Sequence, residues 1–218
     1  MIIVFEGIDG SGKGTQSKNL SEYLTNKGVN NALFSFPNYT GTFFGSEIAK
    51  YLNGSYGSME ALPAEFPAML YALDRFEMKN SIIEAAKSGK TVILDRYVPS
   101  NFAHQAAKLP GDKQDAFIEW VKNVEYNILG LPMPHVVFFL DVPPRVTRSL
   151  VLKKDVRSYT KEKEDIHEKN SDYLEKVYNV YKHIAAKDGW NIIPCMDKDR
   201  LRSQEEIFTS IVSFLASV

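Results

Sequence analysis

Residues 2–16 read IIVFEGIDGSGKGTQ, and this segment gives the strongest indication of the fold. Its first four residues, 2–5, are apolar and β-branched or aromatic, which is typical of a short strand buried on both faces. Gly7 to Lys13 then has the spacing G-x-x-x-x-G-K and leads into a helical pattern. A strand, a glycine turn and a helix in this order indicate a phosphate-binding loop.

The chemistry of this loop follows from its residues. Glycines let the backbone wrap around phosphate oxygens, and the amides at the helix start carry positive partial charge. Lys13 adds a full charge that can reach the β- and γ-phosphates. A plain glycine-rich turn is the alternative. The predicted ATP-binding residues are Gly7, Asp9, Gly10, Ser11, Gly12, Lys13, Gly14, Thr15 and Gln16.

The residue after the lysine departs from the usual motif. Most such loops place Ser or Thr there, and its hydroxyl contacts Mg²⁺. This chain has Gly14, followed by Thr15. The metal-binding hydroxyl is therefore missing or displaced by one residue.

Further strands follow the first one. Residues 91–94 and 136–140 are also continuous apolar runs, and residues 32–36 and 190–193 are weaker candidates. Helical patterns separate these runs, and one of them predicts a core stripe. That stripe comprises Phe66, Met69, Leu70, Leu73 and Phe76. The alternation predicts an α/β fold with a parallel sheet between helical layers.

Composition limits the function further. The chain has 218 residues and a formal net charge of -1, so no global basic field favours a nucleic-acid polymer or an acidic membrane as partner. Cys195 is the single cysteine, and no apolar run approaches membrane-spanning length. We expect one domain over residues 1–218, located in the cytoplasm. The charge-rich stretch within residues 145–168 is either a solvated surface or a mobile lid.

Two further groups suggest an anion site and a base site. Asp95-Arg96-Tyr97 follows a predicted strand, where ligands bind in open α/β sheets. An arginine there can bind a phosphate with two hydrogen bonds, although a surface ion pair is equally compatible. Tyr71 and Arg75 lie one helical turn apart and could stack on a base and bind its edge. A helix-surface pair with Asp74 as the partner of Arg75 is the alternative.

These segments together resemble the thymidylate kinase family. The matching segments are FEGIDGSGK at 5–13, FPNY at 36–39, LYALDR at 70–75, DRYVPSNFAHQ at 95–105 and LDVPP at 140–144. Their order and spacing cover nearly the whole chain. The resemblance implies a three-layer P-loop nucleoside-monophosphate kinase fold with a mobile lid. It also implies transfer of the γ-phosphoryl group of ATP to dTMP, a Mg²⁺ cofactor and a homodimer.

The resemblance also implies roles for individual residues. Lys13 would hold the ATP phosphates, Asp9 the sugar hydroxyl of the acceptor, and Arg96 the acceptor phosphate. Glu6, Asp95 and Thr15 would bind Mg²⁺, mostly through water. The acceptor would contact Asp9, Phe36, Pro37, Tyr39, Tyr71, Arg75, Arg96, Ser100, His104 and Gln105.

Three departures from the family pattern matter. Tyr39 stands where many relatives have an arginine on the acceptor phosphate, and His104 where many have a bulky aromatic residue near the ribose 2′ position. The phosphate loop also lacks the arginine that some relatives carry. A lid cation would then supply that charge, with Arg157 favoured over Arg148, Lys153 and Lys154.

Two other classes stay open. A kinase for another nucleoside monophosphate, or for a deoxynucleoside, is the nearer one. A deoxynucleoside kinase needs a carboxylate base beside the 5′-hydroxyl, and the 32–36 strand ends without one. A nucleotide-binding switch is more remote, because residues 26–29, NKGV, break the N-K-x-D pattern of guanine-specific switches.

Overall fold

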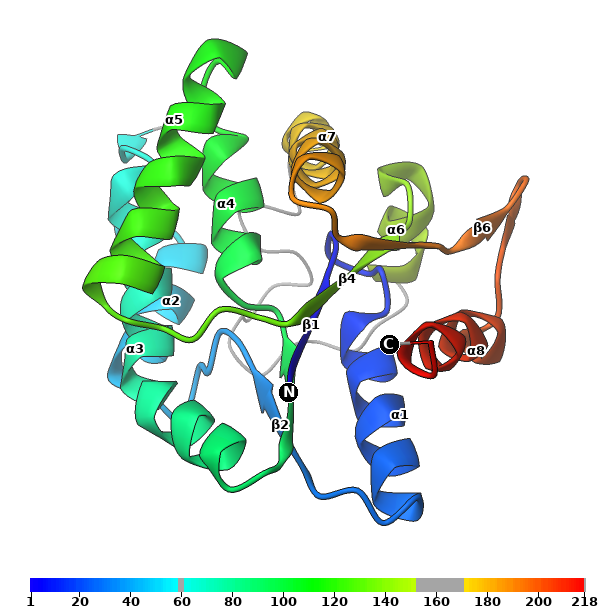
Figure 1. Cartoon of the computed structure of the whole chain (residues 1–218). Coiled ribbons are helices and arrows are strands. Elements are labelled where there is room, and N and C mark those ends of the chain that lie inside the picture. Colours follow the sequence, from blue (N-terminus) through cyan, green and yellow to red (C-terminus); the bar gives the residue numbers. More distant parts are fainter. Residues whose placement is uncertain (59–60, 152–170, 218) are drawn as a thin grey trace.

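The structure, a computed structural model, describes residues 1–58, 61–151 and 171–217. A five-stranded parallel sheet with the order β2-β3-β1-β4-β5 forms its centre (Figure 1). The strands are β1 (Ile2–Glu6), β2 (Asn31–Ser35), β3 (Thr91–Asp95), β4 (Val136–Asp141) and β5 (Asn191–Pro194). All five predicted strands are therefore confirmed, and each observed strand end lies within one residue of its predicted end.

Helices cover both faces of this sheet. On one face lie α1 (Lys13–Asn26) and α8 (Gln204–Leu215), and on the other α3 (Glu65–Lys87), α4 (Val98–Ala106), α5 (Gly111–Lys122) and α7 (Ser171–Lys187). Helix α2 (Phe43–Leu52) packs on α3, and α6 (Pro144–Val151) packs on α7. A π-helix, η2 (Asn123–Ile128), continues α5, and β6 (Met196–Asp197) pairs with β7 (Arg200–Leu201). The predicted three-layer α/β architecture is confirmed.

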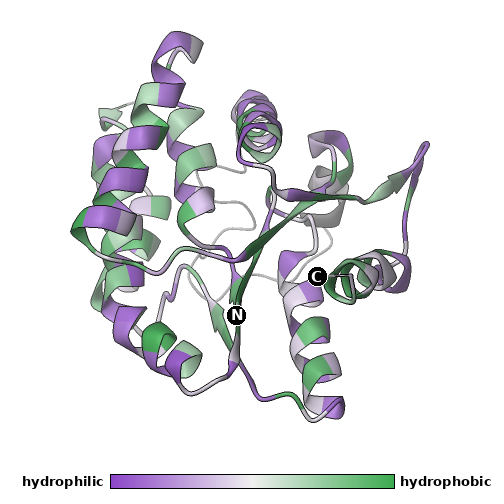
Figure 2. Ribbon diagram, viewed as in Figure 1, coloured by the Kyte–Doolittle hydropathy of each residue, from purple (hydrophilic) through white to green (hydrophobic). Residues whose placement is uncertain are grey.

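The alternation along β1 shows why the sheet is covered twice. Ile2 and Val4 enter the core below α3, α4, α5 and α7, whereas Ile3 and Phe5 enter the core below α1 and α8. Successive side chains of a strand point to opposite faces, so a strand with two buried faces must be apolar throughout. Figure 2 shows this as green central strands between helices whose outer parts are largely purple.

The predicted core stripe of α3 is wrong. Phe66 and Phe76 are 37% and 43% exposed, while Ala68, Ala72 and Arg75 are buried. Small alanine side chains let α3 approach its neighbours closely, and a buried ion pair of Arg75 fixes the rotation of the helix. The two ends of the stripe, Phe66 and Phe76, consequently face outward, whereas Leu70 packs against the cluster of Ile48, Tyr51 and Leu52.

Within the described ranges we found no helix whose length and apolarity would let it span a lipid bilayer.

Candidate active site

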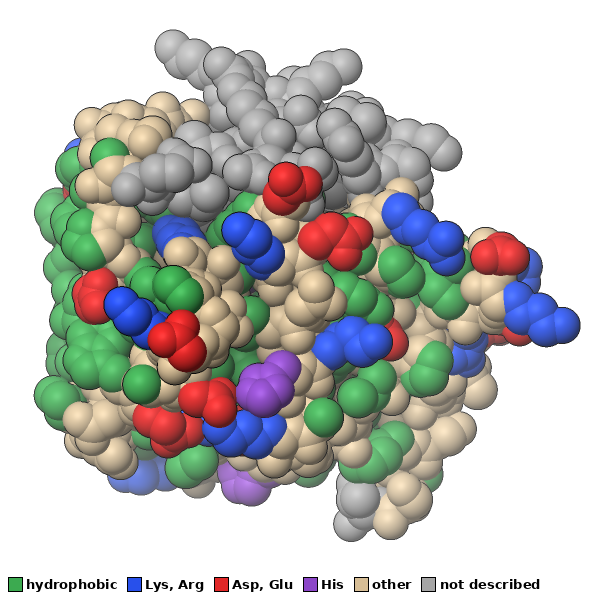
Figure 3. All heavy atoms as spheres, turned by 90° about the horizontal axis from the view of Figure 1, so that it is seen from above, with side chains coloured by type: hydrophobic (Ala, Val, Ile, Leu, Met, Phe, Trp, Pro, Cys, Tyr) green, Lys and Arg blue, Asp and Glu red, His purple; other side chains and the backbone are tan. Residues whose placement is uncertain are grey.

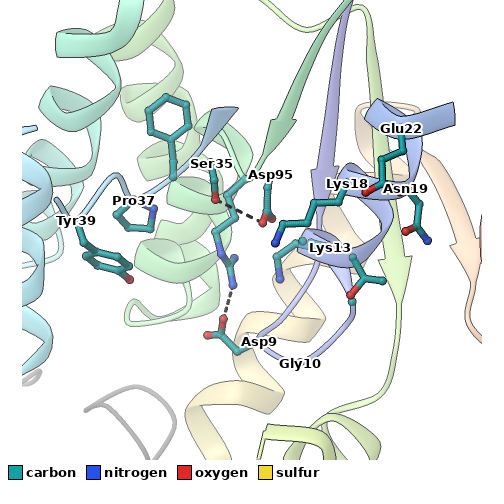
Figure 4. A pocket seen from close by; sticks show the side chains of 15 residues that line it. Asp9, Gly10, Lys13, Lys18, Asn19, Glu22, Ser35, Pro37, Tyr39 and Asp95 are labelled. Carbon is teal, nitrogen blue, oxygen red and sulfur yellow. Dashed lines mark hydrogen bonds and ion pairs between the residues drawn. The ribbon is translucent and has the colours of Figure 1, made fainter. Parts of the chain in front are cut away.

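A pocket of about 590 Å³ opens at the carboxyl ends of β1, β2 and β3 (Figure 4). Many predicted site residues line it together: Asp9, Gly10, Gly12, Lys13, Gly14, Thr15, Phe36, Pro37, Tyr39, Asp95 and Arg96. Four lining residues were not predicted: Lys18, Asn19, Glu22 and Ser35. Lys18 and Glu22 follow Gly14 at intervals of four residues, so a helical projection of α1 from the loop could have found them.

Three predicted ATP-binding residues do not line this pocket. Gly7 lies beneath the loop, where an added Cβ would come within 2.7 Å of Ser11 Oγ and 3.0 Å of the Leu140 carbonyl oxygen. Ser11 is buried beside it. Gln16 donates from Nε2 to the Gln204 carbonyl oxygen at 3.0 Å and so joins α1 to α8. Gly7 and Ser11 are therefore buried within the loop, whereas Gln16 anchors the helix that follows it.

Lys13 begins α1 and is buried under the loop. Its Nζ donates to the Ile8 carbonyl oxygen at 2.8 Å. Burial, followed by the nearby Arg96 charge, lowers the pKa of Lys13 to about 7, although Asp9 and Asp95 oppose this shift. A triphosphate would favour the charged amine and reverse this shift.

Arg96 faces the same pocket from the end of β3. Its Nη2 is paired with Asp9 Oδ1, and its Nη1 donates to Ser100 Oγ at 3.2 Å. Burial opposes its charge, but Asp9 together with Tyr181, Glu6 and Asp95 outweighs burial, and the pKa of Arg96 rises well above its ordinary value. Its backbone has φ of 66°, in the left-handed region that non-glycine residues rarely adopt. Such strain persists where surrounding structure holds a side chain in place, often at functional sites.

The expected metal role of Glu6 is corrected by its burial. Glu6 is fully buried and does not line the pocket. Its Oε1 accepts from the Tyr97 and Ser100 amides at 2.9 and 3.2 Å, and its Oε2 from Ser100 Oγ and Tyr181 Oη at 2.6 and 2.9 Å. Burial raises the pKa of Glu6, while these bonds and Arg96 oppose that rise. Glu6 therefore fixes the start of α4 below Arg96.

Ser100 shares this supporting position. Its hydroxyl donates to Glu6 and accepts from Arg96 Nη1. These hydrogen bonds orient Arg96, and the expected contact of Ser100 with the base edge stays a prediction.

The surroundings of Gly14 account for glycine at the position where the usual motif has Ser or Thr. A Cβ at this position would lie 2.9 Å from Asp95 Oδ2, closer than real Cβ contacts allow. The missing side chain lets Asp95 approach the first turn of α1. From the other side, Ser35 Oγ at the end of β2 lies 3.5 Å from the same carboxylate oxygen. Figure 4 shows Asp95 between Ser35 and the lysines of α1. A carboxylate oxygen facing this pocket is a ligand type that Mg²⁺ prefers.

Among the described residues, no group of three His, Cys, Asp or Glu side chains could hold a metal ion by itself.

Arg75 lies in a second, buried part of the predicted site. Its Nε and Nη2 each donate to Glu125 at 2.6 Å, and the two side chains are 2% and 0% exposed. Burial alone would lower the pKa of Arg75, but Glu125 raises it. Arg75 is therefore not a surface residue paired with Asp74. Glu125, on η2, was missed because nothing in its local sequence marks it.

Helix α4 brings further polar side chains into this buried region. Asn101 donates from Nδ2 to the Ala68 carbonyl oxygen at 2.9 Å and to Glu125 Oε1 at 2.8 Å. Within the part of the chain that the structure describes, its buried Oδ1 has no hydrogen-bond partner, and the same holds for both polar side-chain atoms of Gln105. Buried polar atoms are nearly always paired in folded proteins, so these atoms need an explanation. Asn101 received no role from sequence reasoning.

His104 and Tyr71 complete the predicted acceptor residues. The ring of His104 lies edge-on to Tyr181, with ring centroids 6.1 Å apart. Burial, followed by Arg96, lowers the pKa of His104 to about 3, so the ring is neutral at physiological pH. Tyr71 is half-buried and packs, together with Tyr39, against the cluster formed by Ile48, Tyr51 and Leu52 of α2.

The predicted lid, 145–168, is described only as far as residue 151. Arg157, Lys153 and Lys154 lie outside the described residues, as does the side chain of Arg148.

Comparison with known proteins decides the family. A sequence model of the thymidylate kinases matches residues 5–207. The thymidylate kinase of Plasmodium falciparum is 35% identical and aligns over 99% of this chain and 90% of its own length. That of Schizosaccharomyces pombe is 31% identical, with coverage of 100% and 92%. This chain belongs to the thymidylate kinase family.

Solved thymidylate kinases share the fold. The enzyme from Candida albicans superposes with a TM-score of 0.75 at 22% identity, covering 99% of this chain and 91% of the other. The enzyme from Ehrlichia chaffeensis gives 0.68 at 22% identity, with coverage of 99% and 98%. The P-loop nucleoside-monophosphate kinase fold is therefore confirmed for this thymidylate kinase family member, which is an ATP-dependent nucleoside-monophosphate kinase.

Proposed function

We propose that this chain transfers the γ-phosphoryl group of ATP to dTMP, giving dTDP and ADP. The supporting observation is that Lys13 and Arg96 line one pocket from different elements, α1 and the turn after β3. Phosphoryl transfer depends mainly on positioning and on neutralising negative charge. A pocket that places a cation beside each of the two phosphate-bearing substrates meets both needs.

On the phosphate side, Lys13 and the loop amides bind the ATP phosphates. Arg96 binds the acceptor phosphate, and Asp9 exchanges its contact with Arg96 for the sugar hydroxyl of the acceptor. Tyr39 and Phe36 line the acceptor side of the same pocket. No general base is required, because a phosphate monoester is already largely dianionic at neutral pH.

Mg²⁺ fits this pocket through Asp95, with Thr15 beside it, and the contacts would run mostly through water. Both residues line the pocket and offer oxygen atoms, the ligands that Mg²⁺ prefers. Bound Mg²⁺ would neutralise charge on the transferring phosphoryl group.

On the base side, the ring of Tyr71 stacks on the pyrimidine. Asn101 Oδ1 and both polar side-chain atoms of Gln105 support a polar ligand edge in this region, because they have no hydrogen-bond partner among the described residues. Arg75 adds donors beside Asn101. His104 stays neutral and lies near the sugar, and Arg157 of the predicted lid supplies charge to the γ-phosphate.

We further propose that two copies pair through α2 and α3. Figure 3 shows hydrophobic side chains gathered along the left edge of the molecule, where Figure 1 places α2, α3 and α5. Phe43 is 64% exposed, and Phe66 and Phe76 of α3 are also exposed. Sedimentation equilibrium should give twice the chain mass, and Phe43→Asp with Phe76→Asp should shift it to the monomer.

An acceptor panel tests the activity. ADP release from Mg·ATP is followed with dTMP, dUMP, dCMP, dGMP, dAMP or thymidine, and we expect dTMP to have the highest kcat/KM. A higher value with thymidine would reassign the chain to the deoxynucleoside kinases. Slow hydrolysis without stimulation by any acceptor would favour a nucleotide-binding switch.

A further inference from the structure

The buried contact between Glu125, Arg75 and Asn101 brings three elements together. Glu125 lies on η2, Arg75 on α3 and Asn101 on α4, and all three side chains are almost completely buried. Arg75 gives two hydrogen bonds to the carboxylate and Asn101 gives one. Replacing a buried ion pair by apolar residues is often neutral for stability, so stability alone does not explain why this pair is there.

The contact fixes the orientation of the Asn101 amide. Its Nδ2 donates to two acceptors, the Ala68 carbonyl oxygen and Glu125 Oε1. A flipped amide would place its oxygen against both of these acceptors and lose two hydrogen bonds. The Oδ1 atom is consequently held away from them, as a buried acceptor with no partner.

The contact also selects which donors of Arg75 stay available. A guanidinium has five N–H groups in a rigid plane. Glu125 takes the Nε proton and one Nη2 proton at 2.6 Å each. The remaining donors point away from the carboxylate in the plane of the same group, which Glu125 holds in a fixed orientation.

The position of Glu125 depends on the π-helical turn. Helix α5 continues into η2, whose wider turn changes the direction of the side chains that follow Lys122. The Leu131 amide donates to the Glu125 carbonyl oxygen at 2.9 Å, and Lys79 Nζ donates to the Leu129 carbonyl oxygen at 2.7 Å. These bonds tie the turn to α3, the helix that carries Arg75.

We propose that Glu125 is a positioning residue for acceptor selection. It holds Asn101 as an acceptor and Arg75 as a donor, a pair that complements the N3–H and the C4 carbonyl of thymine or uracil. Cytosine presents the reverse pattern, an N3 acceptor and a C4 amino donor. Its acceptor would then face the Asn101 acceptor, and its donor would face the Arg75 donor. The inference rests on the proposed function, in which Arg75 and Asn101 face the acceptor base.

Substitution of Glu125 by Gln tests this inference. The amide of Glu125→Gln sets an N–H group against donors of Arg75 or Asn101, so that Asn101 becomes free to flip. We expect the ratio of kcat/KM for dTMP to that for dCMP to fall by about tenfold or more, with an unchanged KM for ATP. Glu125→Asp retains the charge with a shorter reach and should give a smaller fall in the same direction. If Glu125→Gln does not fold, the ratio of kcat/KM measured for Glu125→Asp tests the inference instead.

Ile82→Ala serves as the matched control. Ile82 is fully buried on α3 but belongs to the apolar core, so its truncation lowers the melting temperature without touching the network. The dTMP to dCMP ratio should stay at the wild-type value.

Two outcomes would overturn the inference. A folded Glu125 variant with a lowered melting temperature and the wild-type ratio would show a purely structural role. A wild-type enzyme that phosphorylates dTMP and dCMP equally well would have no selection to position. In contrast, a wild-type chain that phosphorylates no monophosphate would refute the proposed function itself.

Discussion

The site contains two arginine–carboxylate pairs that differ in exposure, one on its phosphate side and one on its base side. Arg96 and Asp9 are 15% and 20% exposed at their side chains and line the open pocket, whereas Arg75 and Glu125 are 2% and 0% exposed. An incoming phosphate can reach Arg96 and replace Asp9, because both groups border solvent. Glu125 cannot be displaced in this way. The first pair is an exchangeable contact for a ligand, and the second is a fixed frame.

The largest effect should come from the phosphate side. Lys13→Ala removes a buried cation under the loop and should lower kcat by about 10³-fold, since charge stabilisation dominates phosphoryl transfer. Initial rates with Mg·ATP and dTMP measure it, with circular dichroism to show that the fold is retained. Lys18→Ala removes an exposed lysine that lines the same pocket and should change the rate little. Equal losses in both variants would contradict a specific role for Lys13.

Arg96 should give the next largest effect. Arg96→Gly removes the guanidinium and suits the positive φ of 66°, so that this variant should be at least as stable as Arg96→Ala. We expect both variants to raise the KM for dTMP and lower kcat, with a loss of about 10²-fold in kcat/KM. The KM for ATP should change far less. Wild-type kinetics in either variant would remove Arg96 from the acceptor site.

On the base side, loss of the Tyr71 ring should cost less. Stacking of a base on an aromatic ring contributes about 1–3 kcal/mol, so Tyr71→Ala should raise the KM for dTMP by about tenfold. Tyr71→Phe keeps the ring and should stay close to wild type. If the Phe variant lost as much as the Ala variant, the hydroxyl of Tyr71 rather than its ring would be the important group.

Gly14 tests the close approach of Asp95. A helix prefers Ala to Gly by about 1 kcal/mol, yet Gly14→Ala would place a Cβ 2.9 Å from Asp95 Oδ2. We expect the Mg²⁺ concentration for half-maximal rate to rise by about tenfold, without a fall in melting temperature. Gly111→Ala is the control, because Gly111 begins α5 in open space. An unchanged Mg²⁺ requirement in Gly14→Ala would show that Asp95 needs no such room.

The smallest predicted effect is the uptake of a proton by Lys13 when ATP binds. The pKa of Lys13 is lowered to about 7 in the free protein, so above pH 7 much of the amine is neutral. ATP favours the charged amine and raises this pKa, so binding at pH 8 should take up a proton, and affinity should fall as pH rises above 7. Titration calorimetry in buffers of different ionisation enthalpy measures the uptake. Binding at pH 8 without proton uptake would contradict the shifted pKa.

The phosphate side was largely predictable from sequence. Its residues follow strands directly, and the carboxyl ends of parallel strands meet at one edge of a sheet. Gly7 to Lys13 and Asp95-Arg96 therefore had to lie close together, and they do. The sequence could not show that Gly14 makes room for Asp95, because this depends on a contact between residues far apart in the chain rather than on local spacing.

The base side was much less predictable. The periodicity of α3 favoured Phe66 and Phe76 as core residues, but a helix can be turned by one buried ion pair, and Arg75 and Glu125 turn it here. Glu125 reaches Arg75 only because η2 widens the chain path after α5, and no residue pattern marked that turn. The burial of Glu6 was equally hard to predict from the sequence. Its carboxylate accepts hydrogen bonds from the start of α4 instead of facing the pocket.

The central claim is that ATP and dTMP meet in the pocket between Lys13 and Arg96. Phosphorus NMR of the purified chain with Mg·ATP and dTMP tests it most directly. We expect the γ-phosphorus signal of ATP to disappear while the signals of ADP and dTDP grow in equal amounts, and we expect no change when dTMP is left out. An unchanged spectrum in the complete mixture, or inorganic phosphate in place of dTDP, would contradict it.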